Sequence, residues 1–186
     1  MDNNTNSTKR ISTVRLAKMG MLVAVSIVLV YFIHFPIFPA VAFLEYDPAD
    51  IPILLGTFAF GPLGGILLTI VTAIIQGVTV SAQSGLYGII MHIISTSTLV
   101  LVAGIIYSRH KSKKTAIIAL VSGTIAMALI MVAANMIITP LFMGVPRAVV
   151  WQLMPFIVAF NALKAGINSI VTFLVYKRIS GFLHKM

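Results

Sequence analysis

The sequence predicts an all-α integral membrane protein with six transmembrane helices and both termini in the cytoplasm. Hydrophobic residues make up 59% of the 186 residues and charged residues only 9%, whereas a soluble domain carries about a quarter charged residues. Residues 51–108 and 115–146 contain no Asp, Glu, Lys or Arg, and each segment exceeds the roughly 20 apolar residues that cross a bilayer. These segments are continuously apolar rather than alternating, which predicts helices and not a β-barrel.

The expected helices follow the apolar runs. After a polar tail over residues 1–13, a single domain of residues 14–186 begins with a span at 14–33. The run at 51–80 contains Phe60-Gly61-Pro62-Leu63-Gly64-Gly65, a turn signature that predicts two helices, the first of them short. The last three spans are expected at residues 85–109, 115–140 and 149–176.

The basic residues determine the expected orientation, because cytoplasmic loops of membrane proteins are rich in Lys and Arg. Three basic clusters must lie on one side of the membrane, which requires an even number of crossings between them. Two helices within residues 51–80 meet this requirement, and a single helix does not. The clusters are Lys9, Arg10, Arg15 and Lys18; Arg109, Lys111, Lys113 and Lys114; and Lys177, Arg178 and Lys185.

With this orientation, three of the four acidic residues, Glu45, Asp47 and Asp50, fall in one outside loop. Asp50 directly precedes an apolar run, and we expect its side chain to cap the second helix. Neither Asp47 nor Asp50 forms a carboxylate dyad supported by a nearby base. The sequence therefore predicts no catalytic residues and no metal site.

The formal net charge of +9 does not predict nucleic-acid binding, because the basic residues cluster at the ends of apolar segments, where they face anionic lipid. The chain has no cysteine, which excludes disulfides and thiolate chemistry. It shows no internal repeat and no nucleotide-binding loop. These features indicate a membrane subunit that binds a ligand and depends on a partner for energy, rather than an enzyme.

Polar residues inside the expected spans are the candidates for ligand binding. Lys164 lies within the sixth span, where a charged side chain costs roughly 2.5–3.5 kcal/mol. Asn161 and Asn168 are three residues before and four after it, so they share its helix face. No acidic residue is expected inside a span to pair with Lys164. We expect Asn135, Asn161 and Lys164 to converge on a ligand with carbonyl or anionic oxygens, in a pocket open to the outside; the alternative is that they tie helices together.

Other polar and aromatic residues are weaker candidates. His92, Gln76 and Asn168 are expected mainly to link helices, with His92 retained as a possible ligand contact. Six aromatic residues near the outer helix ends fit an interfacial belt, and from them we retain Tyr46 and Tyr87 as candidates for stacking on a flat ligand. The six are Phe43, Tyr46, Tyr87, Phe142, Trp151 and Phe156.

The first span contains Gly20-x-x-x-Ala24, a spacing of small residues that lets helices approach closely. Packing within the molecule is the simplest interpretation of this common pattern, and contact with a partner is the alternative.

Five motifs carry a resemblance that covers nearly the whole chain after about residue 14. They are Asp47-Pro-Ala-Asp50-Ile-Pro, Phe58-Ala-Phe60-Gly61-Pro62, Gly88-Ile-Ile-Met-His92, Asn135-Met-Ile-Ile-Thr-Pro140-Leu-Phe-Met-Gly144 and Pro155-Phe-Ile-Val-Ala-Phe160-Asn161-Ala-Leu-Lys164-Ala-Gly166. In these motifs the chain resembles the substrate-binding S components of energy-coupling factor (ECF) vitamin transporters, most of all the riboflavin-specific type. The last two are the most specific. The riboflavin members usually space Pro, Phe and Asn closely, whereas Ile157-Val-Ala intervenes here.

The resemblance implies a six-helix subunit of the cell membrane that binds riboflavin from outside as a transported ligand, not as a cofactor. It implies partners, namely a transmembrane coupling subunit and two ATP-binding subunits. In the riboflavin members, the residues that match Asn135, Asn161 and Lys164 bind the flavin ring. Gly20 and Ala24 match the small-residue face that contacts the coupling subunit.

Two alternatives remain open at this point. The same architecture could carry another vitamin, such as folate or pantothenate. A small membrane enzyme or a channel would need features that the sequence does not show. An enzyme requires a convergent nucleophile or acid–base pair, and a channel requires polar residues through the full depth of the membrane.

Overall fold

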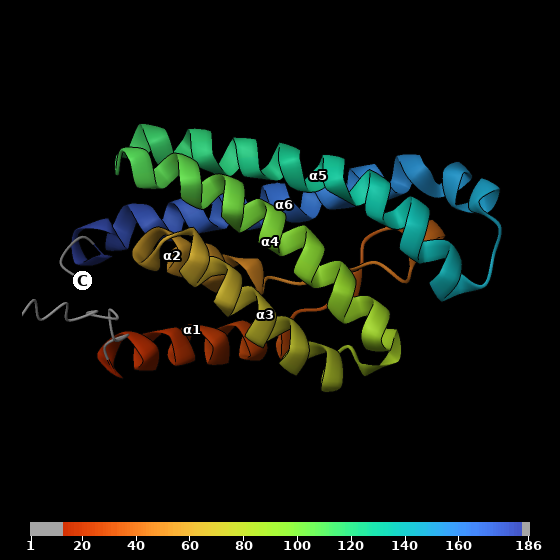
Figure 1. Cartoon of the computed structure of the whole chain (residues 1–186), viewed down its shortest axis with the longest axis horizontal. Coiled ribbons are helices and arrows are strands. Elements are labelled where there is room, and N and C mark those ends of the chain that lie inside the picture. Colours follow the sequence, from red (N-terminus) through yellow and green to blue (C-terminus); the bar gives the residue numbers. More distant parts are fainter. Residues whose placement is uncertain (1–12, 184–186) are drawn as a thin grey trace, which may run out of the picture.

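The computed structural model describes residues 13–183, with side chains described as far as Arg178. Most of the expected polar tail at residues 1–13, including Lys9 and Arg10, lies outside the described residues, as does Lys185. Within the described part the chain forms six α-helices, two 3₁₀ turns and two short β-strands of two residues each (Figure 1). The helices are α1 (Thr13–Phe32), α2 (Asp50–Phe60), α3 (Pro62–Val78), α4 (Gly85–Arg109), α5 (Lys113–Met143) and α6 (Arg147–Leu183).

The predicted turn within residues 51–80 is confirmed and separates α2 from α3. Gly61 adopts φ 85°, a left-handed conformation that only glycine enters without steric cost. Pro62 then begins α3, where its fixed φ suits the first helical turn and its missing N–H loses no helical bond. Gly-Pro is therefore both the stop of one helix and the start of the next.

The last two helices are longer than the sequence indicated. α5 continues through Pro140 to Met143 and ends at Gly144, which has φ 66°. α6 contains Pro155 in its interior. A proline removes only one backbone donor from a helix, and membrane helices tolerate this because neighbouring groups satisfy the carbonyl that it leaves.

Four of the described helices are long and apolar enough to cross a membrane, namely α1, α4 with its preceding turn, α5 and most of α6. α2 has only 11 residues, about 16 Å at 1.5 Å per residue, against a hydrocarbon core of about 30 Å. Its residues 52–58 are all buried, so α2 lies inside the bundle. By contrast, Leu129 and Ile170 are 68% and 63% exposed, as expected of side chains that face lipid.

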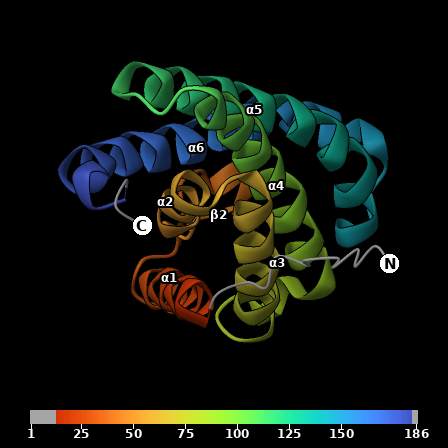
Figure 2. The same ribbon diagram turned by 60° about the vertical axis from the view of Figure 1, so that its left-hand side comes forward.

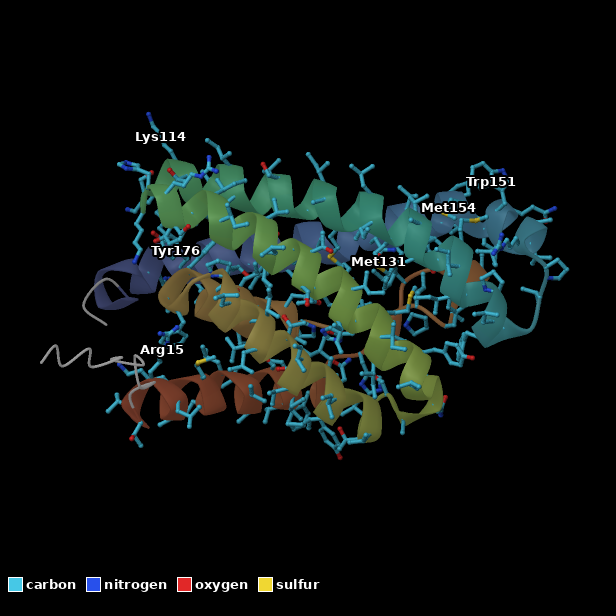
Figure 3. All side chains as sticks on the ribbon, viewed as in Figure 1. Arg15, Lys114, Met131, Trp151, Met154 and Tyr176 are labelled. Atoms are coloured by element: carbon cyan, nitrogen blue, oxygen red, sulfur yellow. The ribbon has the colours of Figure 1, made fainter. Side chains whose placement is uncertain are left out.

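The helices run back and forth along one axis, so the bundle has two distinct ends (Figures 1 and 2). One end, here called the basic end, carries the α4–α5 turn and the ends of the described chain. Figure 3 shows Arg15, Lys114 and Tyr176 at this end and Trp151 and Met154 at the other. The opposite end, here called the loop end, is formed by residues 33–49, 79–84 and 144–146.

The loop at residues 33–49 folds back against the bundle rather than extending into solvent. Its strands β1 (Phe35–Pro36) and β2 (Glu45–Tyr46) pair antiparallel, and the turn η1 (Pro39–Val41) packs against α6. A second turn, η2 (Ala82–Ser84), connects α3 to α4. Val41 is fully buried beside Val150 and Ile157 of α6. This folding places the residues after Glu45 inside the bundle.

Candidate ligand-binding site

A cavity of about 120 Å³ lies between the loop at residues 33–49 and helices α3, α4, α5 and α6. Its wall combines apolar side chains with side chains that form hydrogen bonds. The apolar part is formed by Phe43, Leu44, Ala73, Ile89, Met91, Met127, Met131 and Phe160. The polar part is formed by Glu45, Asp47, Gln76, Ser81, Ser84, His92, Ser95, Asn161 and Lys164.

Lys164 is paired with Asp47, which corrects the expectation that this lysine has no acidic partner. The Lys164 Nζ lies 2.7 Å from Asp47 Oδ2, and the two side chains are only 10% and 6% exposed. A buried ammonium needs a counter-charge, and the bent-in loop provides it. Asp47 is not in a helix and not in an exposed loop either, which is why counting charges within helices missed it.

Asp47 also holds the loop together and ties it to α3. Its Oδ1 accepts a hydrogen bond from Ala49 N at 3.1 Å, and its Oδ2 accepts a second one from Gln76 Nε2 at 3.3 Å. Burial by itself raises the pKa of the Asp47 carboxyl, but the Lys164 ammonium, His92 and the Ala49 amide outweigh it and hold the pKa below its ordinary value. Asp47 is therefore a carboxylate at neutral pH.

Asp50 does not cap α2, which corrects the second expectation about the acidic residues. It is fully buried. Its Oδ1 accepts a hydrogen bond from Thr96 Oγ1 at 2.7 Å, and its Oδ2 accepts one from Asn168 Nδ2 at 3.1 Å. Asp50 is the first residue of α2, but its carboxylate links this helix to α4 and α6 and is absent from the cavity wall.

Asn168 is the centre of this polar network. Besides Asp50, its Nδ2 donates to the Asp47 carbonyl at 3.1 Å, and its Oδ1 accepts a hydrogen bond from the Tyr46 hydroxyl at 3.0 Å. One asparagine on α6 therefore fixes Tyr46, Asp47 and Asp50. The helix-linking role expected for Asn168 is what its contacts show.

Two buried polar atoms of the cavity wall have no hydrogen-bond partner among the described residues, namely Gln76 Oε1 and His92 Nε2. His92 Nε2 lies 3.8 Å from Asp50 Oδ1, which is too long for a hydrogen bond. Leaving a buried polar group unpaired costs about 1–3 kcal/mol. A ligand with hydroxyl or amide groups would remove this cost at both positions.

The predicted site residues divide into those that the cavity brings together and those that it does not. Asn161, Lys164 and His92 all line it. Tyr87 lines a smaller neighbouring cavity of about 60 Å³, where its ring lies 5.5 Å from that of Phe142. Tyr46 belongs to the loop itself and is buried, and its hydroxyl donates to Asn168 Oδ1.

Asn135 is buried on α5 but is absent from the cavity wall, which Met131 reaches instead. Its Nδ2 donates to the Met131 carbonyl at 2.8 Å, and its Oδ1 accepts a hydrogen bond from Thr139 at 2.8 Å. Its amide is thus engaged within its own helix. Asn161 uses its Nδ2 similarly, on the Ile157 carbonyl at 2.8 Å.

Gly20 and Ala24 lie far along the sequence from these residues, on an exposed face of α1. A Cβ added at Gly20 would meet nothing within 4 Å. The small residues therefore do not serve close packing within the described part of this chain.

Comparison with known proteins gives consistent results over almost the whole chain. Residues 14–176 match the family described as "ECF transporter, substrate-specific component". The riboflavin transporter RibU of Staphylococcus aureus (strain TCH60) is 30% identical over 179 residues, which cover 92% of this chain and 93% of that protein. The riboflavin transporter FmnP of Bacillus subtilis (strain 168) is 24% identical, with 92% and 94% covered.

Solved structures resemble the fold as well. A structure described as the S component of a bacterial ECF transporter is 30% identical and superposes with a TM-score of 0.78, covering 91% of this chain and 96% of that one. The structure of FolT bound with folic acid is 21% identical, with a TM-score of 0.63 and coverages of 90% and 95%. The second likeness concerns the fold alone.

Proposed function

Because the chain belongs to the family of ECF transporter substrate-specific components, we propose that it binds riboflavin and supplies it to an energised uptake complex. It is a multi-pass protein of the cell membrane and a transport subunit, not an enzyme. Its relatives at 24–30% identity are riboflavin transporters. The single observation in this molecule that carries the proposal is the combination of apolar and hydrogen-bonding side chains in the cavity wall.

Riboflavin also combines an apolar part with polar groups, which is why such a wall supports the proposal. Its flat ring system is largely apolar, one ring edge offers two carbonyl acceptors and one N–H donor, and its side chain carries several hydroxyls. Met127, Met131 and Phe160 supply an apolar surface for the ring, as in most small-molecule sites. An asparagine can both donate and accept, whereas a lysine only donates, so Asn161 and Lys164 match the carbonyl edge.

The hydroxylated chain would then meet the acidic and unpartnered groups. Asp47 accepts hydrogen bonds, and Gln76 Oε1 and His92 Nε2 lack partners among the described residues. Hydroxyls can donate to the carboxylate and to the amide oxygen, and the histidine nitrogen can act in either direction depending on its tautomer. Asn135 remains a proposed third ring contact, and it would have to exchange its bonds within α5 to reach the ligand.

Ligand binding must widen this site. A cavity of about 120 Å³ is smaller than the roughly 300–1,000 Å³ usual for small-molecule sites. The loop at residues 33–49 is the wall that can move, because the helices around the cavity are packed against one another. Because its ammonium has three N–H donors, Lys164 would donate to a ring carbonyl while it keeps its bond to Asp47, so that neither buried charge loses its counter-charge.

The complete transporter follows from the family as a further proposal. We propose six membrane crossings with both termini and the basic end in the cytoplasm, so that the loop end and its cavity face outside. The partners would be a transmembrane coupling subunit and two ATP-binding subunits, and the exposed Gly20–Ala24 face of α1 would contact the coupling subunit.

Purification in detergent followed by a visible absorption spectrum tests the ligand directly. We expect flavin bands at close to one flavin per protein, and quenching of riboflavin fluorescence when the ligand is added to protein from which it has been removed. A colourless protein that leaves riboflavin fluorescence unchanged would refute riboflavin as the ligand. Binding of folate or pantothenate in parallel calorimetric titrations would then assign the same architecture to another vitamin.

A further inference from the structure

A second hollow lies on the outside of the bundle and shares no lining residue with the ligand cavity. It is a groove of about 450 Å³ between α5 and α6, near the basic end. We propose that this groove holds an acyl chain of an anionic phospholipid, whose phosphate is bound by the lysines and arginine at its mouth. The groove is lined by Ile117, Leu120, Val121, Thr124, Ile125, Gly166, Ser169, Ile170, Phe173 and Leu174.

The groove offers no hydrogen-bonding group to an occupant, although two hydroxyl residues line it. Thr124 Oγ1 and Ser169 Oγ bond to each other at 3.1 Å, which links α5 to α6 and hides both groups. The hollow is deepened at Gly166, where an added Cβ would meet nothing within 4 Å. An apolar chain fits such a surface, and a polar ligand does not.

Basic residues of both helices stand at the same end of the groove. α5 begins with Lys113 and Lys114, about one turn before the first groove residue, Ile117. On α6, Lys177 and Arg178 follow the last groove residue by about one turn, and they line a hollow that shares Leu174 with the groove. Because α5 and α6 run antiparallel (Figure 1), these four cations meet at one mouth.

No carboxylate compensates these cations within the described residues. The sequence has four acidic residues. Asp47 and Asp50 are buried in the network beside the cavity, Glu45 stands at the cavity wall of the loop end, and Asp2 lies outside the described residues. All four basic side chains at the mouth are exposed. A phosphate group therefore supplies the charge that this part of the protein lacks, as basic pockets between membrane helices do for lipid headgroups.

The position of the groove favours lipid over a protein partner. α1, whose small-residue face is proposed for the coupling subunit, lies across the bundle from α5 (Figure 2). The groove thus stays in contact with the bilayer when that face is covered. A membrane supplies an acyl chain and a phosphate in one molecule, with the phosphate held at the level of the interface, where the basic end would lie.

Lipid binding can be measured on the purified full chain by native mass spectrometry, with phosphatidylglycerol and phosphatidylcholine of identical acyl chains. We expect phosphatidylglycerol to bind at least about tenfold more tightly. The double variant Lys177→Gln with Arg178→Gln should reduce this preference several-fold. Exchanging the two residues, Lys177→Arg with Arg178→Lys, keeps both charges and should preserve it.

A second pair of variants tests the acyl-chain part. Gly166→Leu fills the groove and should lower the number of bound lipids of both headgroup types. Ala133→Leu adds the same volume to an exposed position of α5 outside the groove and should change nothing. The melting temperature in detergent serves as the check that each variant is folded.

Two results would overturn the proposal. Equal binding of the two lipids by the unmodified protein would refute the headgroup site. If Gly166→Leu leaves lipid binding unchanged and impairs assembly of the transport complex, then a protein partner and not lipid occupies the groove. Neither result depends on whether riboflavin is the transported ligand.

Discussion

At the scale of single residues, the Asp47–Lys164 pair has two roles that mutagenesis can separate. Breaking a buried pair by removing one partner leaves a lone charge and typically costs about 3–5 kcal/mol of stability. Replacing both partners by neutral residues of similar size removes that cost. Lys164 is also a proposed ligand contact, so binding and stability should respond differently to single and double substitutions.

We therefore expect Lys164→Met to lower both the melting temperature in detergent and the affinity for riboflavin. The double variant Lys164→Met with Asp47→Asn should recover most of the melting temperature, because no charge is left unpaired, while riboflavin binding stays weak. Thermal unfolding and fluorescence quenching measure the two effects on the same samples. Full affinity in the double variant would show that Lys164 serves the fold and does not contact the ligand.

The unpartnered amide oxygen of Gln76 leads to a second prediction at this scale. Gln76→Leu removes a proposed acceptor for a ligand hydroxyl together with the Gln76 hydrogen bond to Asp47, and the loss of one buried hydrogen bond to the ligand costs about 1–3 kcal/mol, or roughly 5- to 150-fold in affinity. Thr72→Val is the matched control on the same helix. Its hydroxyl is also buried without a partner in the described structure, but it is outside the cavity wall, so riboflavin titration should show unchanged affinity. Equal losses in both variants would point to a general disturbance of α3.

At the scale of helices, the apolar runs, the turn signature and the basic clusters together predicted the number and order of the α-helices. The lengths of the apolar runs and the Gly61-Pro62 turn are local signals in the sequence, and they located all six helices of the described chain. The ends of α5 and α6 were less predictable, because Pro140 and Pro155 are locally unfavourable and only packing against other helices makes them acceptable.

The candidate site was only half predictable for the same reason. The spacing of Asn161, Lys164 and Asn168 is a property of one helix, and all three are buried as a shared face would require. The partners of that face come from a loop more than a hundred residues earlier. A loop rich in proline and acidic residues is predicted to be exposed to solvent, and no local pattern in the sequence shows that it bends into the bundle.

Close packing between α2, α3 and α4 depends on glycine and gives a prediction at this scale. A Cβ added at Gly65 of α3 would lie 2.2 Å from Thr57 Oγ1 on α2 and 3.1 Å from Val100 Cβ on α4. Gly65→Val should therefore force these helices apart and lower the melting temperature strongly, because overpacking costs about 1–3 kcal/mol or more. Gly20→Val, with open space around it, should leave the melting temperature nearly unchanged. A stable Gly65→Val variant would mean that the helices pack less closely than described.

At the scale of the whole molecule, the proposed ligand site, the basic residues and the proposed coupling face occupy different regions of the bundle. The cavity of the proposed riboflavin site is lined in part by residues of the loop end, the cations lie at the basic end, and α1 lies across the bundle from α5 (Figures 1 and 2). The buried α2 connects these regions, because it packs against α1, α3, α4 and α6 and begins at the network around Asp50. A ligand that displaces the loop would act first on this helix.

This separation predicts that coupling can be lost while ligand binding is kept. Gly20→Leu with Ala24→Leu adds bulk to an exposed face of α1 where the fold has room, so riboflavin quenching by the purified protein should stay normal. Co-purification with the coupling subunit and riboflavin uptake by cells should both be lost, because the two surfaces can no longer approach closely. Ala133→Leu on α5 serves as the control and should assemble and transport normally. Normal uptake by the α1 double variant would place the coupling contact on another face, whereas loss of binding in the purified protein would show that α1 communicates with the cavity through α2.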